Sequence, residues 1–397
     1  MTKRISQIST ISMTTFGALL FGAIACSPPI MLPPVQEPLD SVAWKNCAAE
    51  AEARTGRSMI DDITKDSPAL MCKGVALSNE KKHEDEAVEM LTESALLDKA
   101  DYRPYWLSGR VLTRAGRYEE ALTHFSRAKK RAPNMEVPVV KLAQMVVEER
   151  GDLEAMLFLE KARERDMCTF SCRGMLADQY HKAGRVDDAK KIYKDMIDEN
   201  PDDPEAYIGL ARISNVAREF DKEADYLREA IKSKGYDALD EERQATLYFS
   251  EAFALYNAEK YKTAKKRLEK AMRTQSPAEW LLLAGWIELK LGESAMALIQ
   301  FEKAIKKNDK LAAAHAGAGD AAKALGNLKD ARDFYRQATT LDPTNGVDRL
   351  KLAAVYIDRK EYDKAETQLD DAIKLGEDKL PPKLLQQVKD ALRAAGK

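Results

Sequence analysis

Histidine, cysteine and carboxylate side chains are the groups in this sequence that could catalyse a reaction or bind a metal. The only four histidines are far apart in the chain: His83, His124, His181 and His315. None lies in an H-E-x-x-H pattern, and the sequence has no G-x-S-x-G motif, phosphate-binding loop or dinucleotide fingerprint. The carboxylates fall at positions typical of exposed helix surfaces. We therefore expect a protein that is not an enzyme and uses no cofactor.

The five cysteines fall into two groups. Cys26 ends an apolar leader, and an even number follows: Cys47, Cys72, Cys168 and Cys172. An even number of cysteines in an oxidising compartment indicates disulfides. We predict the pairs Cys47–Cys72 and Cys168–Cys172, although four cysteines allow three pairings and the sequence alone does not choose among them. A metal site is the alternative, but the Cys-x3-Cys spacing does not suit a zinc knuckle, and we predict no metal.

The first 25 residues have the layout of a signal peptide. Lys3 and Arg4 form a basic start, and the apolar stretch at 16–25 (FGALLFGAIA) is too short to span a bilayer as a helix. The leader ends in A-I-A-C, which resembles a bacterial lipobox, although alanine stands at position −3, where leucine is commonest. The resemblance implies lipidation of Cys26, and Ser27 after it implies the outer membrane. The alternative is an ordinary signal peptide cut nearby, with Cys26 a free thiol.

Composition excludes few other classes. The chain has 397 residues, of which 45% are hydrophobic and 32% charged, so it can bury a large core. Its formal charge of −2 gives no electrostatic footprint for nucleic acid, so we predict no nucleic-acid partner. Residues 27–38 (SPPIMLPPVQEP) are proline-rich and are expected to form a semi-extended tether that holds the folded part away from the lipid.

Residues 102–135 have the pattern of two amphipathic helices joined by a tight turn. Apolar and small side chains recur three and four residues apart in each half, and Gly116 between them suits a turn. Pro133 marks the end of the second helix. Helices this short are not stable alone in water, so the pair must bury its apolar face against neighbours.

This stretch resembles the tetratricopeptide repeat, a helix–turn–helix unit of about 34 residues. Seven positions of the repeat pattern match, namely Tyr105, Gly109, Leu112, Ala121, Phe125, Ala128 and Pro133. Position 7 departs, because it is Ser108 where leucine is expected. The resemblance implies an all-α, right-handed solenoid of stacked helix pairs.

Further copies follow in register. Repeats start at 102, 136, 170 and 204, the period slips over residues 238–244, and further units start near 245, 278, 312 and 346. The first helix of the unit near 278 fits better one residue earlier. Position 20 of the repeat at 204 departs, because it is Glu223 rather than a small residue. Residues 383–394 read as a helix that caps the open end.

The predicted organisation therefore has six parts. They are a signal peptide at 1–25, the lipidated cysteine and tether at 26–38, a helix and a degenerate repeat at 39–101, repeats 1–4 at 102–237, repeats 5–8 at 238–379, and the cap at 380–397.

The resemblance also implies a partner-binding groove lined by the first helix of each repeat. Early repeats place polar or basic groups there: Arg103, Trp106, Arg110 and Arg114, then Gln144, Asp178, Lys182, Arg212 and Asn215. The middle repeats place apolar groups there or nearby: Phe249, Phe253, Tyr256, Leu282, Trp286 and Leu289. We hypothesise that this apolar cluster seats a helical or apolar segment of a partner, beside a basic half that meets acidic groups. The alternative is that these side chains are additional core, or that residues 238–244 fold back over them.

Two classes of function follow from the resemblance. The first is a lipid-anchored periplasmic scaffold that binds another envelope protein in a secretion, pilus, motility or cell-wall assembly. The second is a non-catalytic module that binds peptidoglycan, polysaccharide or a peptide. A subunit of an enzyme complex, with the chemistry elsewhere, is a third and weaker alternative. The sequence does not identify the partner.

Overall fold

The computed structural model describes residues 30–56, 66–80 and 82–396. Within these ranges the chain is helical and contains no β-strand, which confirms the all-α prediction. None of the described helices combines the length and the apolar character needed to cross a bilayer. The described part divides into two compact units, one ending at Pro138 and one beginning at Val139.

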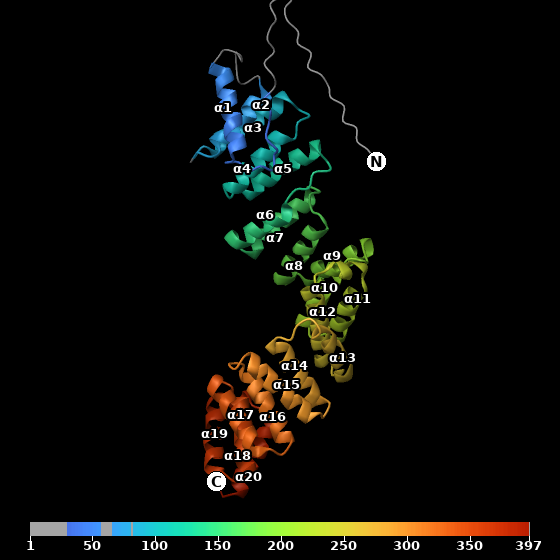
Figure 1. Ribbon diagram of the computed structural model, residues 1–397, viewed down its shortest axis with the longest axis vertical. Coiled ribbons are helices and arrows are strands. Elements are labelled where there is room, and N and C mark those ends of the chain that lie inside the picture. Colours follow the sequence, from blue (N-terminus) through green and yellow to red (C-terminus); the bar gives the residue numbers. More distant parts are fainter. Residues whose placement is uncertain (1–29, 57–65, 81, 397) are drawn as a thin grey trace, which may run out of the picture. The chain divides into compact units, whose positions relative to one another are not determined.

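The described part of unit 1 contains five helices, which Figure 1 labels α1–α5. They are α1 (Val42–Gly56), α2 (Ser67–Leu77), α3 (Glu84–Leu97), α4 (Arg103–Arg114) and α5 (Tyr118–Arg131). Helices α2/α3 and α4/α5 form antiparallel pairs, as the degenerate repeat and the repeat at 102 predict. A disulfide between Cys47 on α1 and Cys72 on α2 joins the first helix to the first pair, with their Cα atoms 5.4 Å apart.

Unit 2 contains seven further pairs and a final helix. Its first helices are α6 (Val139–Arg150), α8 (Phe170–Lys182), α10 (Pro204–Val216), α12 (Glu241–Asn257), α14 (Ala278–Lys290), α16 (Ala312–Ala324) and α18 (Gly346–Asp358). Its second helices are α7 (Asp152–Glu164), α9 (Val186–Glu199), α11 (Phe220–Lys232), α13 (Tyr261–Ala271), α15 (Ser294–Lys307), α17 (Leu328–Leu341) and α19 (Tyr362–Lys374). Short 3₁₀ turns at Lys234–Ala238 (η2) and Glu377–Lys379 (η3) precede α12 and the cap α20 (Pro382–Ala394).

The boundary between the units differs from the predicted grouping, which kept residues 102–237 together. Residues 135–138, between α5 and α6, have no regular structure, and the repeat at 102 therefore belongs to the first compact unit. Across this boundary the second helices α5 and α7 start 34 residues apart, at Tyr118 and Asp152, whereas the first helices α4 and α6 start 36 residues apart, at Arg103 and Val139.

In most repeats a left-handed residue at position 15 turns the chain from the first helix to the second. Glycine fills this position at Gly116, Gly184, Gly292 and Gly326, with φ between 72° and 81°. Where it is not glycine, Lys82 adopts a φ of 70°, and Arg218, Glu259 and Lys360 adopt φ of 57–61°. The repeat at 136 differs, because its left-handed residue is Gly151 at position 16, with a φ of 90°.

The two helices of a pair approach most closely at positions 8 and 24. A Cβ added to Gly109 would lie 2.7 Å from the Phe125 ring, and one added to Gly285 would lie 2.5 Å from the Phe301 ring. Gly285 is position 8 only if its repeat starts at 278. The first helix of this unit therefore keeps the common register, and the expected offset of one residue is not observed.

The cap buries one face on the last pair. Leu385, Val388 and Leu392 of α20 belong to the same apolar cluster as the α18 and α19 side chains, and Leu384 packs against its edge. This arrangement agrees with the predicted role of the last helix, which covers the open end of the array.

Candidate protein-binding groove

A groove of about 700 Å³ runs along the first helices α8, α10 and α12 of unit 2. Its floor is apolar, with Ala211 and Leu227 buried and Ile208 partly buried. Its walls are polar, and Val216 on α10 leaves an apolar side chain 71% exposed at the groove. This combination can bury apolar side chains of a ligand while polar groups fix its backbone or charges.

The groove continues past α8 toward α6. A second hollow of about 460 Å³ includes Val140 and Gln144 on α6, and shares Asp178, Arg212 and Arg243 with the first. The two hollows together, here called the channel, are lined by four consecutive first helices. Asp178, Lys182, Arg212, Asn215 and Gln144, which the repeat template placed on the groove side, line it as expected.

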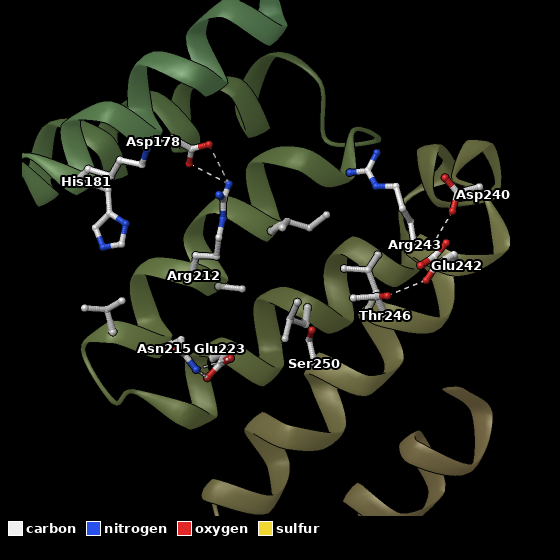
Figure 2. A pocket seen from close by; sticks show the side chains of 16 residues that line it. Asp178, His181, Arg212, Asn215, Glu223, Asp240, Glu242, Arg243, Thr246 and Ser250 are labelled. Carbon is white, nitrogen blue, oxygen red and sulfur yellow. Dashed lines mark hydrogen bonds and ion pairs between the residues drawn. The ribbon is translucent and has the colours of Figure 1, made fainter. Parts of the chain in front are cut away.

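An ion pair links α8 to α10 across the groove. Figure 2 shows Arg212 facing Asp178, with Nη2 2.9 Å from Oδ1. The hydroxyl of Tyr193, on α9, donates to the same carboxylate, and burial is the main cause of the raised pKa of this tyrosine. The same arrangement recurs on α16–α18, where Tyr335 donates to Asp320 and Lys351 lies 2.7 Å from it. In both places the aspartate at position 9 binds a tyrosine of its own repeat's second helix and a basic side chain of the next repeat, and so links the two repeats.

The inserted residues 238–244 build one wall of the groove. Together with η2 they give α12 an earlier start, so this helix is 17 residues long. Asp240 caps the helix by accepting from Arg243 N at 2.7 Å, and Arg243 pairs with Glu205 of α10. Asp240, Arg243 and Thr246 all line the groove. The insertion that interrupts the 34-residue period thus lengthens α12 at its start, and this added turn lines the groove.

Glu223, which replaces the small residue expected at position 20, binds a groove residue of the preceding helix. Glu223, on α11, is buried and accepts two 3.0 Å hydrogen bonds from the Asn215 amide of α10 (Figure 2). Burial raises the pKa of this carboxyl, and the Asn215 hydrogen bonds oppose that rise. A small residue here would leave the Asn215 amide without these two acceptors.

The predicted apolar cluster on α12 and α14 is mostly attached to the core. Five of its six members are partly buried and pack against core clusters, namely Phe249, Tyr256, Leu282, Trp286 and Leu289. Phe249 stacks on the buried Trp280 with ring centroids 5.0 Å apart, and Trp286 meets Phe301 edge-on at 5.1 Å. Phe253 differs, since its side chain is 41% exposed. This geometry fits the alternative of additional core for five members, and leaves Phe253 as the exposed one.

Residues 238–244 form the end of η2 and the start of α12, and η2 packs next to α11. Leu239 packs against the same core cluster as Phe249 and Tyr256, while Asp240 and Arg243 line the groove. The segment therefore contacts the core beside part of the predicted apolar cluster and also contributes to the groove wall.

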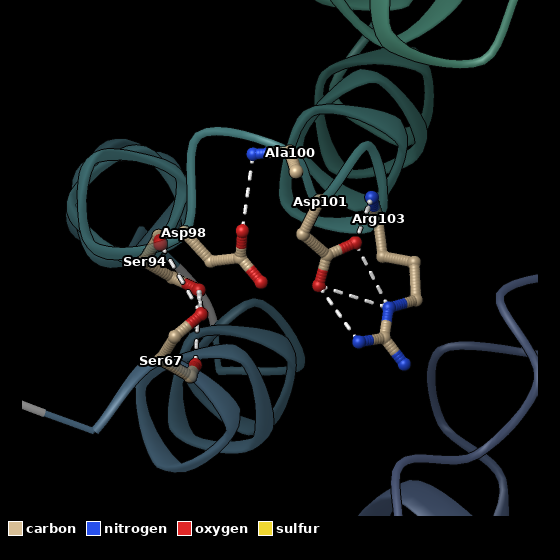
Figure 3. Close-up of polar contacts among 6 residues, drawn as sticks. All are labelled: Ser67, Ser94, Asp98, Ala100, Asp101 and Arg103. Atoms are coloured by element: carbon tan, nitrogen blue, oxygen red, sulfur yellow. Dashed lines mark hydrogen bonds and ion pairs between the residues drawn. The ribbon is translucent and has the colours of Figure 1, made fainter.

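The predicted basic residues of unit 1 are engaged within that unit. Figure 3 shows Arg103 folded back on Asp101, with Nη2 2.8 Å from Oδ2. Arg114 donates to Ser78 O and, at 2.7 Å, to Asn79 Oδ1. Arg110 donates to the carbonyls of Val35 and, at 2.6 Å, Glu37. These three guanidinium groups bind partners within the chain.

The tether prediction needs correction for its described part. Residues 30–38 do not extend freely, because Ile30 and Val35 are buried and Arg110 holds the Val35 and Glu37 carbonyls. Apolar side chains among the prolines can be buried once a concave surface is nearby, which composition alone does not reveal. Cys26 and the leader lie outside the described residues.

The structure joins the remaining cysteines in the pairs favoured above. Cys168 and Cys172 are bonded across the start of α8, with Cα atoms 5.1 Å apart. In the described part of the chain, no three His, Cys, Asp or Glu side chains are grouped in a way that could hold a metal ion.

Sequence reasoning missed Val216, Arg243 and Thr246 as groove residues. Val216 occupies position 13 of its repeat, so the template could have identified it. Arg243 lies in the inserted segment, to which a repeat template assigns no position. The helical pattern of residues 241–257 was the available signal, because it extends one turn before the template start.

Family models of the tetratricopeptide repeat match residues 85–136, 175–238, 282–346 and 322–381, more than half of the chain in total. No curated protein matches the chain significantly. Similar solved structures include YrrB, described as a TPR protein with an unusual peptide-binding site. It is 23% identical, with a TM-score of 0.40, covering 50% of this chain and 97% of that one.

Two further similar structures have lower sequence identity. PilF of Pseudomonas aeruginosa is 19% identical with a TM-score of 0.45, covering 56% of this chain and 96% of its own. PilW, described as a type IV pilus biogenesis factor, is 16% identical with a TM-score of 0.46, covering 55% and 97%. Repeats of the matched kind are typically non-catalytic scaffolds that bind proteins. This chain belongs to the tetratricopeptide repeat family.

Proposed function

We propose that this protein is a lipid-anchored scaffold of the periplasm that binds a segment of another envelope protein in the groove of α6–α12. The partner belongs to an envelope assembly, such as a secretion, pilus, motility or cell-wall machine. The observation that carries the binding role is that two hollows, lined by four consecutive first helices, share Asp178, Arg212 and Arg243.

The channel suits a polypeptide better than a small molecule. It crosses four first helices, and its charged groups are spread along it in pairs rather than gathered around one point. Arg212 is paired with Asp178, Lys182 with Asp152, and Arg243 with Glu205. Such pairs can open to meet charges of a partner and fix its register, while the apolar floor contributes affinity.

The envelope location rests on the leader sequence. A basic start, a short apolar stretch and a cysteine after A-I-A are together typical of a lipoprotein signal. Replacing Cys26 with serine is expected to move the protein from the membrane fraction to the soluble fraction, and mass spectrometry of the N-terminal peptide would show the lipid in the original chain. Wild-type protein that is soluble, with an unmodified thiol, would contradict the anchor.

The binding role can be tested by photo-crosslinking in the native envelope. A photoreactive residue at Val216, inside the groove, is expected to capture one defined partner. The matched control is Leu153 on α7, whose side chain is also well exposed, at 62%, but lies outside the groove lining. Equal capture at both sites would contradict the groove. Co-sedimentation with purified cell wall that is lost in Arg212→Glu would instead support the alternative of a polymer-binding module.

A further inference from the structure

We propose that residues 30–40, here called the strap, are an intramolecular ligand of unit 1. The strap occupies a peptide-binding face formed by α4 and the end of α2, and it excludes other segments of the same kind. This inference is independent of the partner groove in unit 2, because it concerns different helices and a ligand that the chain itself supplies.

The strap contains one short pattern twice. Pro34 precedes Val35, and Pro38 precedes Leu39, so a proline followed by an apolar residue recurs after four positions. Each proline opens a turn closed by a 3.0 Å backbone hydrogen bond from the residue three positions on. The apolar side chain after each proline is buried, with Val35 4% and Leu39 6% exposed. The two turns therefore present two apolar anchors to unit 1.

The carbonyls of these same two anchors are bound by side chains. Arg110 of α4 donates to Val35 O, and Asn79, just after α2, donates through Nδ2 to Leu39 O at 2.9 Å. Arg114 holds that amide in place by donating to Asn79 Oδ1 at 2.7 Å. Since the donors contact main-chain atoms, they would hold any segment with the same turns, and the apolar anchors provide the selectivity.

The binding face occupies the same template positions as the groove of unit 2. Arg110 and Arg114 are positions 9 and 13 of their repeat, and Arg212 and Val216 are positions 9 and 13 of theirs. In unit 2 these positions line the groove, whereas in unit 1 Arg110 binds the strap and Arg114 binds Asn79, which in turn donates to the strap. The strap therefore lies where a partner segment lies in the proposed function.

The charge of Arg110 is satisfied by groups of the strap. Burial is the main cause of the lowered pKa of Arg110, and the Glu37 carboxylate of the strap opposes that shift. The Val35 and Glu37 carbonyls of the strap accept hydrogen bonds from its guanidinium. Release of the strap would leave these donors facing solvent, ready for another segment of the pattern proline–apolar–x–x–proline–apolar.

Peptide binding to a strap-released chain tests this proposal. In the full chain, Val35→Asp combined with Leu39→Asp should release the strap, because two carboxylates cannot be buried cheaply at the anchor sites. A fluorescent peptide of residues 30–41 should then bind saturably, and at least tenfold more weakly to the wild-type chain, where the strap competes at high effective concentration. Adding Arg110→Ala to the released chain should weaken binding about tenfold, as expected for a lost charged hydrogen bond. The same peptide with both aspartates is the matched control.

The proposal is overturned if the released chain keeps amide protection in α4 and α5 yet binds both peptides equally. If the released chain fails to fold, a second design applies. A protease site inserted after the exposed Asp40 allows the strap to be cut in the folded chain. Exchange of the cut strap for the labelled peptide, but not for the aspartate peptide, supports the proposal. A cut strap that never exchanges is a fixed part of the fold and overturns it.

Discussion

The two units use equivalent helix positions in opposite ways. In unit 1, position 9 is Arg110, and its guanidinium donates to the chain's own carbonyls. In the unit 2 repeat that starts at 204, position 9 is Arg212, whose side chain is 54% exposed in the groove and pairs with Asp178. One repeat template can therefore yield either a closed face or an open one, depending on which segments the chain places next to it.

The comparison teaches that a basic residue at a groove position does not by itself identify a partner site. A partner site also requires that the donors of this residue are not already bound to acceptors within the chain, as those of Arg110 are.

Removing the two disulfides should affect unit 1 more than unit 2. The Cys47–Cys72 bond closes a separation of 25 residues and the Cys168–Cys172 bond a separation of 4. On the chain-entropy model the first contributes about 3.5 kcal/mol and the second about 2 kcal/mol. Each cysteine pair would be replaced by alanines, and hydrogen exchange measured separately in each unit would give the loss of stability caused by each replacement. A larger loss of protection for the second pair would contradict the comparison.

Lowering the pH should destabilise unit 1 specifically. Burial, reinforced by the nearby Arg127, lowers the pKa of His124 to about 4 from its ordinary 6.5. Between these values the unfolded chain binds the proton and the folded chain does not, so stability falls as the pH drops from about 6.5 to about 4. His124→Phe should remove this dependence in hydrogen exchange of α5.

Buried carboxylates of unit 2 should change the stability in the opposite direction as the pH falls. Burial raises the pKa of Glu223 and of Glu251, which lies between Arg228 and Arg267. Above the ordinary carboxyl pKa the folded state holds these protons more tightly, so the same drop in pH adds stability to α11–α13. Equal acid sensitivity of both units would show that His124 is not the cause.

Overpacking tests the register in both units. Ala121 of α5 and Ala331 of α17 are fully buried at position 20, where the two helices of a pair are in contact. Leucine at either position should cost about 1–3 kcal/mol. Gln337→Leu, at an exposed position of the same α17 helix, is the control and should have little effect. A thermal melt unchanged by Ala331→Leu would refute the assigned register.

Replacing Arg110 or Arg212 by alanine should change the stability least, but should separate the two units most clearly. Arg110→Ala leaves the Val35 and Glu37 carbonyls without their donor and should destabilise unit 1 by about 1–2 kcal/mol. Arg212→Ala removes an exposed ion pair and should cost less than about 1 kcal/mol. Chemical denaturation, followed by hydrogen exchange in α4 and α10, separates the two. Equal costs would remove the distinction between closed and open faces.

Most of the fold could be predicted from the sequence because each repeat specifies itself locally. Small residues at positions 8, 20 and 27, a left-handed residue at position 15 and aromatic side chains at position 24 lie close together in the chain. They fixed the helix pairs, the starts at 34-residue spacing and the capping helix. The side of α8 and α10 that lines the groove followed from the same template.

Features that depend on neighbours distant in sequence could not be predicted. The contact of Arg110 with Val35 joins residues 75 positions apart, and a proline-rich composition resembles a free tether whether or not a binding face is present. The inserted turn of α12 lies outside any template position, so Arg243 gave no signal as a groove residue. The sequence could not show whether the apolar cluster on α14 belongs to the core or to the groove, because both kinds of side chain recur three and four residues apart on this helix.

The most direct test of the account compares partner capture in two matched charge reversals. A photoreactive residue at Val216 would be placed in the wild-type chain, in Arg212→Glu and in Arg110→Glu, and the yield of the partner adduct would be measured in the envelope. The account predicts that Arg212→Glu abolishes the adduct and that Arg110→Glu leaves it at the wild-type level. Loss of the adduct in Arg110→Glu, with Arg212→Glu unaffected, would contradict the assignment of the open groove to unit 2.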